Sequence, residues 1–217
     1  MELMYNSHMT TIKEQLKVAY DADAKRRSNN EDKRDLWKLN CREYFIHLLN
    51  ERNLKTILEL GAGVGIDSKY FLDKGFDVLA TDLSEEMING CKERGLNARV
   101  LDLSELENLG KTFEGIYSMN VLLHTPRNEI KMVLKSISNV LSEDGIFFYG
   151  VYGGIDEEKT ITDNKKMGLP RYFSFLSDSY LQDVVKEQFN TIKFETIEIG
   201  SDKPNFHFQS LYLQKRI

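Results

Sequence analysis

The chain has few of the residues and segments that mark several large protein classes. Its 217 residues include only two cysteines, Cys41 and Cys91, which lie far apart and lack the spacing of a zinc site or a disulfide framework. No apolar run approaches the roughly 20 residues of a membrane-spanning helix, and no signal-peptide pattern opens the chain. We therefore expect a cytoplasmic protein with two reduced thiols and no membrane partner.

Positively charged residues are fewer than negatively charged residues. The 29 lysines and arginines are outnumbered by 34 aspartates and glutamates, which gives a net charge of −5. This balance predicts no general attraction to long nucleic acids or to anionic membranes. Hydrophobic residues make up 41% of the chain, enough for a full core, so one α/β domain with a short N-terminal addition is expected.

The most informative segment is Thr56–Asp67, with the sequence TILELGAGVGID. An apolar run that carries Glu59 near its end and continues as Gly-x-Gly-x-Gly predicts a buried parallel strand turning sharply into a helix. A second apolar run ends about 20 residues later at Asp82, where a carboxylate can accept hydrogen bonds from both hydroxyls of a ribose. The sequence thus predicts a nucleoside-binding crevice.

The glycine spacing argues against two common nucleotide-binding loops. A dinucleotide-binding turn reads G-x-G-x-x-G, whereas the third glycine here, Gly65, comes one position early and is followed by Ile66. No Lys-Ser or Lys-Thr pair follows, so the loop is not a P-loop. A nicotinamide-dependent oxidoreductase is therefore disfavoured, but it stays open as an alternative.

After residue 53, strand-like and helix-like segments alternate, which predicts a parallel sheet with helices on both faces. Strands are expected at Thr56–Leu60, Phe76–Thr81, Ala98–Leu101, Phe113–Met119 and Gly145–Tyr152, and helices at Ile66–Lys74, Ser84–Arg94 and Arg127–Leu141. The end of the chain does not continue this alternation of strands and helices. A helix is expected at Asp178–Gln188, followed by an antiparallel pair of strands, Thr191–Ile199 and Phe206–Lys215.

The segment before the sheet has helical character and many charges. The polar stretch Asp21–Arg34 is expected to interrupt it as an exposed loop or a frayed helix. Asp35–Leu49 has apolar residues near helical spacing and is expected to pack at the edge of the sheet. The chain is thus divided into a helical cap segment, residues 1–53, and a ligand-binding domain, residues 54–217.

With its flanking strand and helix, the segment ELGAGVG resembles motif I of the class I S-adenosylmethionine-dependent methyltransferases. Five parallel strands followed by an antiparallel hairpin are similar to the seven-stranded Rossmann-like sheet of that family, over about Leu54 to Ile217. The resemblance implies S-adenosylmethionine as cofactor, S-adenosylhomocysteine as product, and in-line methyl transfer to a small-molecule acceptor. A non-catalytic, nucleoside-binding protein of the same fold stays open as a second alternative.

The resemblance also implies a set of cofactor contacts. Glu59 is expected to support the ammonium end of the methionine, Asp82 the ribose, and Asp102 the adenine amine. The whole expected set is Glu59, Gly61, Ala62, Gly63, Gly65, Asp67, Asp82, Leu83, Met87, Asp102, Leu103 and Asn120. Structural roles stay open for the acids: Glu59 or Asp67 as a brace for the loop, and Asp82 or Asp102 as a cap.

Catalytic and substrate contacts are expected outside this common core. Tyr20 resembles the tyrosine that lies over the cofactor in many small-molecule methyltransferases, and His124, after the fourth strand, is a candidate general base. Trp37, Tyr152 and Arg171 are the expected substrate contacts. Arg171 is suited to clamp an anionic substrate or the cofactor carboxylate, or to tie down its own loop.

Two further absences restrict the expected methyl acceptor and the expected use of a metal. No Asn/Asp-Pro-Pro-Tyr/Phe sequence follows the fourth strand, which disfavours methylation of planar amides and of the adenine amine. No cluster of histidines and acids indicates a divalent metal, so no metal site is expected. The sequence does not define the acceptor atom, nor does it distinguish a monomer from a homodimer.

Overall fold

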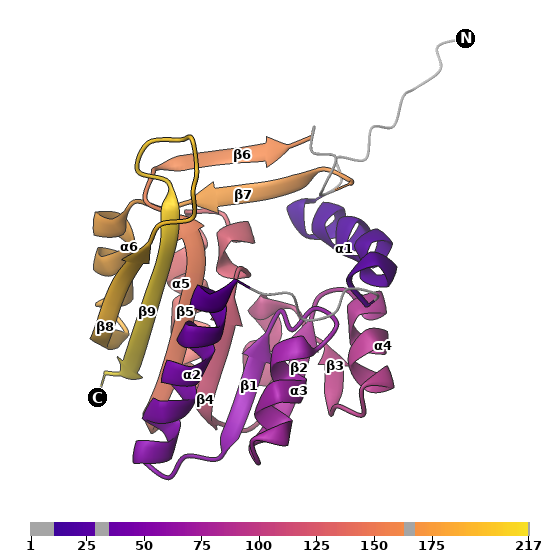
Figure 1. The fold of residues 1–217 in the computed structure, drawn as a ribbon, viewed down its shortest axis with the longest axis vertical. Helices are drawn as coiled ribbons and strands as arrows, with labels where there is room; N and C mark the ends of the chain where they lie inside the picture. Colours follow the sequence, from indigo (N-terminus) through magenta and orange to yellow (C-terminus); the bar gives the residue numbers. More distant parts are fainter. Residues whose placement is uncertain (1–10, 29–34, 163–167, 217) are drawn as a thin grey trace.

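The computed structural model describes residues 11–28, 35–162 and 168–216. Its centre is a seven-stranded sheet with the order β3-β2-β1-β4-β5-β9-β8 (Figure 1). The parallel strands are β1 (Thr56–Leu60), β2 (Asp77–Asp82), β3 (Ala98–Val100), β4 (Phe113–Met119) and β5 (Leu141–Gly153). Strand β9 (His207–Lys215) runs antiparallel to β5 and to β8 (Phe189–Ile197), which confirms the predicted terminal hairpin.

Helices cover both faces of this sheet. They are α1 (Ile12–Ser28), α2 (Leu36–Glu51), α3 (Ile66–Asp73), α4 (Glu85–Glu93), α5 (Ile130–Val140) and α6 (Asp178–Val185), with short 3-10 helices η1 (Leu103–Leu109) and η2 (Leu122–His124). Because side chains alternate along a strand, Phe147 and Tyr149 of β5 pack with α5 and α6, whereas Ile146 and Phe148 pack with α2 and α3. None of the described helices has the length and apolar character that crossing a membrane requires.

Helix α1 differs from its prediction. It continues as a regular helix through Ser28, so the exposed-loop alternative is wrong over residues 21–28; residues 29–34 lie outside the described part. The cause is pairing of the charged side chains: Asp23 is only 7% exposed and accepts hydrogen bonds from Arg26 and Arg27 one turn further along. Helix α1 packs against α4 and β7, beyond the carboxyl ends of β2 and β3 (Figure 1).

Helix α2 packs on the face of the sheet and not, as predicted, at its edge. The Phe45 ring centroid lies 5.3 Å from that of Tyr117 on β4 and 6.4 Å from that of Phe148 on β5, and all three rings are fully buried. The aromatic residues of the two central strands give α2 its binding surface. A helix over the middle of a sheet buries both elements more fully than a helix at the edge.

A small hairpin between β5 and α6 was not predicted. Strands β6 (Glu157–Ile161) and β7 (Arg171–Phe175) pair antiparallel in a separate two-stranded sheet, which lies next to α1 (Figure 1). In this register Ile161 is opposite Arg171, and Lys159 is opposite Phe173. The hairpin thus brings side chains from late in the chain to the N-terminal helix.

Candidate functional site

A cavity of about 920 Å³ opens at the carboxyl ends of the parallel strands, bounded on the far side by α1. Its volume lies within the roughly 300–1,000 Å³ of small-molecule sites. The predicted site residues that line it are Tyr20, Glu59, Gly61, Ala62, Gly63, Asp67, Asp82, Leu83, Asp102, Leu103, Asn120, His124, Tyr152 and Arg171. The structure therefore brings together predicted residues from both parts of the chain.

Three predicted residues are not part of the cavity wall. Gly65 is the N-cap of α3, and a Cβ there would lie 2.4 Å from Leu96, so this glycine permits close packing of the helix. Met87 is fully buried in a cluster beneath the wall. The ring centroid of Trp37 lies 4.4 Å from that of Phe208, and Trp37 packs with the core below the site.

The glycine loop leaves room for a ligand at one position. Gly61 and Gly63 both have positive φ angles, of 62° and 55°. A Cβ on Gly61 would lie 2.3 Å from a methyl group of Val121, whereas no atom of the described residues comes within 4 Å of a Cβ on Gly63. Gly63 is therefore the point where a bound molecule can lie directly against the main chain.

Asp82 connects the glycine loop to α4. One carboxylate oxygen accepts a hydrogen bond from the Gly63 N–H at 2.9 Å, and the other accepts from the Ser84 N–H at 2.9 Å. Burial raises the pKa of Asp82, and these two backbone donors act against that rise. Ser84 in turn caps α4 by accepting from the Met87 N–H at 3.1 Å, as predicted.

Glu59 and Asp67 are buried acids that brace the loop and also line the cavity. Glu59 accepts a hydrogen bond from the Ser68 hydroxyl. Asp67 pairs with Arg42 of α2 at 3.0 Å, and the Arg42 guanidinium lies 3.6 Å from the centroid of the Tyr70 ring. The ion pair fixes the first turn of α3 to α2, which sets the orientation of the loop.

Asp102 follows β3 and caps η1. The same carboxylate oxygen accepts from the Ser104 N–H at 2.8 Å and from the Lys13 ammonium at 2.9 Å. Burial acts to raise the pKa of Asp102, but these two donors outweigh it and lower the pKa. The capping role is thus present, and Lys13 adds a contact from α1 that the sequence did not indicate.

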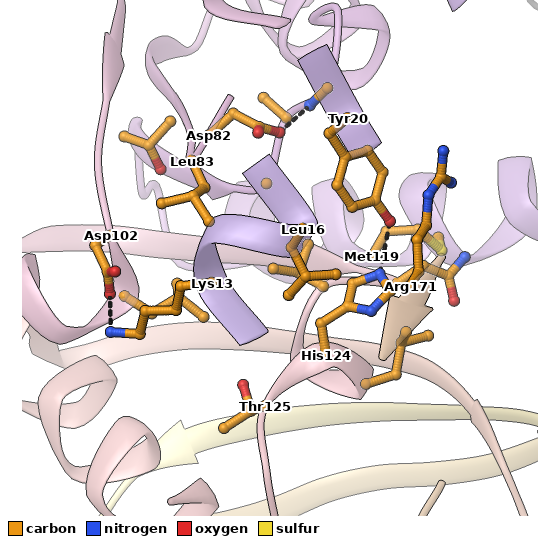
Figure 2. A pocket seen from close by; sticks show the side chains of 18 of the residues that line it. Lys13, Leu16, Tyr20, Asp82, Leu83, Asp102, Met119, His124, Thr125 and Arg171 are labelled. Carbon is orange, nitrogen blue, oxygen red and sulfur yellow. Dashed lines mark hydrogen bonds and ion pairs between the residues drawn. The ribbon is translucent and has the colours of Figure 1, made fainter. Parts of the chain in front are cut away.

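Tyr20 and His124 form a hydrogen-bonded pair across the cavity (Figure 2). The Tyr20 hydroxyl lies 2.6 Å from His124 Nε2, and His124 Nδ1 lies 2.6 Å from the Tyr172 carbonyl oxygen. A carbonyl only accepts, so this hydrogen-bond network assigns the imidazole proton to Nδ1, and Nε2 accepts from Tyr20. Burial, with a smaller contribution from Arg171 and Arg27, lowers the pKa of His124 to about 4.

Arginine side chains surround the Tyr20 ring. The Cζ atoms of Arg27 and Arg171 lie 5.3 Å and 4.4 Å from its centroid, and Arg171 extends alongside the ring in Figure 2. Both pair with Asp23, at 2.8 Å and 3.0 Å, and Arg26 pairs with it at 2.6 Å. Burial raises the pKa of the Tyr20 hydroxyl, and the two nearer arginines oppose this rise.

The sequence did not predict Asp23, Arg27 and Lys13 as part of this arrangement. Arg27 and Lys13 line the cavity, and Asp23 lies behind Arg27 and Arg171. A local signal existed, because Asp23, Arg26 and Arg27 have the spacing of ion pairs along one face of a helix. No feature of the neighbouring sequence indicated that Asp23 contacts β7, which lies about 150 positions further along the chain.

Comparison with known proteins agrees with this architecture. A family model described as a methyltransferase domain matches residues 57–145. Uncharacterized methyltransferase C70.08c of Schizosaccharomyces pombe is 31% identical over 121 residues, which cover 50% of this chain and 45% of that protein. The chain spans about half the length of the curated relatives it matches.

Solved structures resemble nearly the whole chain. The 1,6-didemethyltoxoflavin-N1-methyltransferase of Burkholderia thailandensis, solved with its acceptor and S-adenosylhomocysteine, has a TM-score of 0.66 at 22% identity, covering 94% of this chain and 88% of that one. The magnesium protoporphyrin IX methyltransferase of Synechocystis PCC 6803, solved with S-adenosylmethionine, has a TM-score of 0.68 at 13% identity, with coverages of 97% and 100%. Residues 57–145 of this chain thus match a methyltransferase domain, and the chain shares the seven-stranded, Rossmann-like fold of these solved methyltransferases.

Proposed function

We propose that this chain binds S-adenosylmethionine in the cavity and transfers the methyl group to a small-molecule acceptor. The observation that carries the proposal is the pairing of Gly63 with Asp82. Gly63 offers main chain that no Cβ covers, and its N–H holds the Asp82 carboxylate beside the same opening. A ribose needs both features, a close approach to the main chain and an anion that accepts from two hydroxyls.

The other acids fit the remaining parts of the cofactor. Asp102 would receive the adenine amine at one carboxylate oxygen, because its hydrogen bonds from Lys13 and Ser104 all use the other oxygen. Leu83 and Leu103 would offer apolar surface for the adenine ring. Glu59 lies near the end of β1 and Asp67 in the first turn of α3, and both line the cavity, where they would face the ammonium group of the methionine moiety. The similar structures solved with S-adenosylmethionine and S-adenosylhomocysteine support the choice of cofactor in this proposal.

In this proposal helix α1, the described part of the predicted cap segment that borders the cavity, covers the cofactor as a lid. Helix α1 lines the cavity through Leu16 and Tyr20 and is bonded to the rest of the protein at separate points along its length. Lys13 pairs with Asp102, the Asp21 carboxylate accepts from the Ser84 hydroxyl at 2.6 Å, and Asp23 pairs with Arg171. These contacts would exclude water from the reacting atoms.

The cofactor supplies a methyl group already activated by the sulfonium charge. What the chain must add is alignment of the nucleophile and a route for its proton. Tyr20 and His124 offer that route, because a proton can pass to the Tyr20 oxygen while the Tyr20 hydroxyl proton passes to His124 Nε2. Burial lowers the pKa of His124 to about 4, so the ring is neutral at pH 7 and Nε2 keeps the lone pair that accepts from Tyr20.

Calorimetry with S-adenosylhomocysteine tests the proposal, with NADH as the comparison ligand. We expect binding of S-adenosylhomocysteine at a ratio of one to one and no heat with NADH. The absence of S-adenosylhomocysteine binding at high micromolar concentration would contradict the proposal. Transfer of labelled methyl from S-adenosylmethionine into a mixture of small metabolites then distinguishes an enzyme from a protein that only binds the nucleoside.

A further inference from the structure

We infer that Lys13, in the first turn of α1, recognises the adenine base of the cofactor. Its ammonium group donates a hydrogen bond to a ring nitrogen that flanks the adenine amine, either N7 or N1. Lys13 is then a specificity-determining residue that the lid contributes to the site, and not only a point of attachment for α1. This inference rests on the proposed function and adds a base contact to the same site.

The Lys13 ammonium group is held at the cavity wall by two hydrogen bonds. It donates to Asp102 Oδ1 at 2.9 Å and to the Ser104 hydroxyl oxygen at 3.1 Å, and all three residues line the cavity. Figure 2 shows the Lys13 side chain extending from α1 to Asp102. An ammonium group carries three hydrogens and is never an acceptor. Two hydrogens are used here, so the third is left for an acceptor on a bound molecule.

The Asp102 carboxylate presents its second oxygen beside this ammonium group. Oδ1 accepts from the Ser104 N–H and the Ser104 hydroxyl, both at 2.8 Å, in addition to Lys13. No hydrogen bond between described residues uses Oδ2. The two contacts from Ser104 fix the carboxylate to the start of η1. An amine bound at Oδ2 therefore lies next to the Lys13 ammonium group.

The edge of adenine carries the complementary order of groups. Its 6-amino group donates, and the ring nitrogens on either side of it, N1 and N7, accept. An amine at Asp102 Oδ2 thus brings one ring nitrogen toward Lys13. Leu103 offers a donor for the other, because it begins η1 and the first N–H groups of a helix have no acceptor within the helix. A donor, an acceptor and a donor of the protein then face an acceptor, a donor and an acceptor of the base.

Apolar side chains provide surface for the flat base beside Lys13. Leu16 lies one turn from Lys13 on the same face of α1 and is only 6% exposed. Leu83 follows β2 and Leu103 follows β3, and all three leucines line the cavity. A base that contacts these leucines buries its faces and keeps its polar edge for Asp102 and Lys13.

Attachment of α1 is the competing explanation for the contact between Lys13 and Asp102. The Lys13 side chain is 50% exposed and that of Asp102 is 20% exposed, and an ion pair this open to water contributes little to stability. If attachment were the only role, loss of Lys13 would weaken every ligand that the lid covers by the same factor. A hydrogen bond to the base instead affects only those ligands that have the ring nitrogen.

Deaza analogues of S-adenosylhomocysteine separate these two roles. In the 7-deaza and 1-deaza analogues a C–H group replaces N7 or N1, and the amine remains. We expect one of them to bind the unmodified protein roughly fivefold to tenfold more weakly than S-adenosylhomocysteine in calorimetry. Lys13→Met should abolish most of that difference, because the donor is gone, and Lys13→Arg should retain part of it.

Lys17→Met is the matched control. Lys17 lies one turn further along α1 and pairs with Asp21, but it is not part of the cavity wall. The side chains of Lys13 and Lys17 are 50% and 44% exposed, so neither substitution disturbs the core. Lys17→Met should therefore show the same difference between S-adenosylhomocysteine and the weaker analogue as the unmodified protein.

The other outcomes overturn the inference or the proposed function separately. If Lys13→Met weakens S-adenosylhomocysteine and both analogues by one common factor, Lys13 only attaches the lid and the inference is wrong. The inference is also wrong if both analogues bind the unmodified protein as tightly as S-adenosylhomocysteine does. If S-adenosylhomocysteine itself does not bind to the unmodified protein, the proposed function fails.

Discussion

Tyr20 and His124 lie 104 positions apart in the chain, and their side chains meet at 2.6 Å. His124 is bonded on its other side to the Tyr172 carbonyl of β7, so one imidazole connects helix α1, the short helix η2 that follows β4, and the small hairpin. The protonation state of this single ring therefore depends on all three segments being docked. That dependence can be measured.

The first prediction concerns the tautomer and charge of His124. Burial lowers its pKa to about 4, so the ring stays neutral from pH 8 to pH 5 with its proton on Nδ1. Nitrogen NMR of protein with labelled histidine should show one protonated and one bare nitrogen for His124 over this range. Tyr20→Phe should shift the Nε2 signal and leave Nδ1 protonated. An imidazolium signal for His124 at pH 6 would contradict the assignment.

The same pKa has a consequence for stability. An unfolded histidine takes up a proton near pH 6.5, whereas folded His124 does so only near pH 4. Between these values the unfolded state binds more protons, so His124 makes the free energy of unfolding fall as the pH is lowered from 6.5 to 4. His124→Gln should reduce the slope of that fall, as measured by urea unfolding at several pH values.

The second prediction concerns Asp82. Asp82→Asn removes the charge that is proposed to accept from the ribose hydroxyls, and hydrogen bonds to a charged group contribute roughly 1.5–3 kcal/mol. We expect the affinity for S-adenosylhomocysteine to fall roughly 10- to 100-fold in calorimetry. Asp77→Asn, at the exposed start of the same strand, is the control and should bind normally. Equal affinity in the two variants would remove the ribose assignment.

The third prediction compares two glycines that differ in location and not in conformation. Gly63 and Gly75 both have positive φ angles, and a Cβ on either meets no atom of the described residues within 4 Å. Alanine at each position should therefore cost about 1–2 kcal/mol of stability. Gly63→Ala alone should also weaken S-adenosylhomocysteine roughly tenfold or more, because its methyl group would enter the space proposed for the ligand.

Unfolding in urea and calorimetry separate these two effects. Gly75→Ala reports the cost of strain without the ligand, since Gly75 follows α3 away from the cavity. If both variants lose the same affinity for S-adenosylhomocysteine, the loss comes from general destabilisation, and Gly63 does not border the ligand.

The sequence predicted the parts of the site that are set by local chain geometry. Gly63, Asp82 and Asp102 lie at the ends of apolar runs, and parallel strands bring such ends to the same edge of the sheet whatever the rest of the fold. The predicted bounds of the central strand β4, Phe113–Met119, are those of the structure. These features depend only on a few neighbouring residues, so they can be recognised directly in the sequence.

The parts that were missed depend on contacts distant in sequence. Helix α1 extends through a stretch of charged residues because Arg171, on a hairpin that the sequence did not indicate, completes the pairing of Asp23. Strand β6 is polar and half exposed, so it lacks the apolar alternation that marks a strand. Met87 was expected at the adenine for its position after Asp82, but the packing of α4 turns it into the core.

The last prediction tests the contact between Asp23 and Arg171. Both side chains are buried, and Asp23→Asn would leave the Arg171 guanidinium without this carboxylate. We expect a loss of roughly 3 kcal/mol in the free energy of unfolding at pH 7. Burial acts to raise the pKa of Asp23, but its three arginine partners outweigh burial and lower it well below the usual range. The contribution is therefore complete above about pH 4 and decreases as the pH falls further.

Urea unfolding at pH 7 and pH 3 measures this dependence, with Asp73→Asn as the control. Asp73 forms an exposed ion pair with Lys69 on the surface of α3, and such pairs contribute less than about 1 kcal/mol. The difference between Asp23→Asn and the unmodified protein should be smaller at pH 3 than at pH 7, because at pH 3 the Asp23 carboxyl group is largely protonated in the unfolded chain although it is still charged in the folded protein. A difference at pH 7 no larger than that of Asp73→Asn would show that α1 is not fixed to β7 by this ion pair, and its contacts through Lys13, Tyr20 and Asp21 would then have to hold the lid.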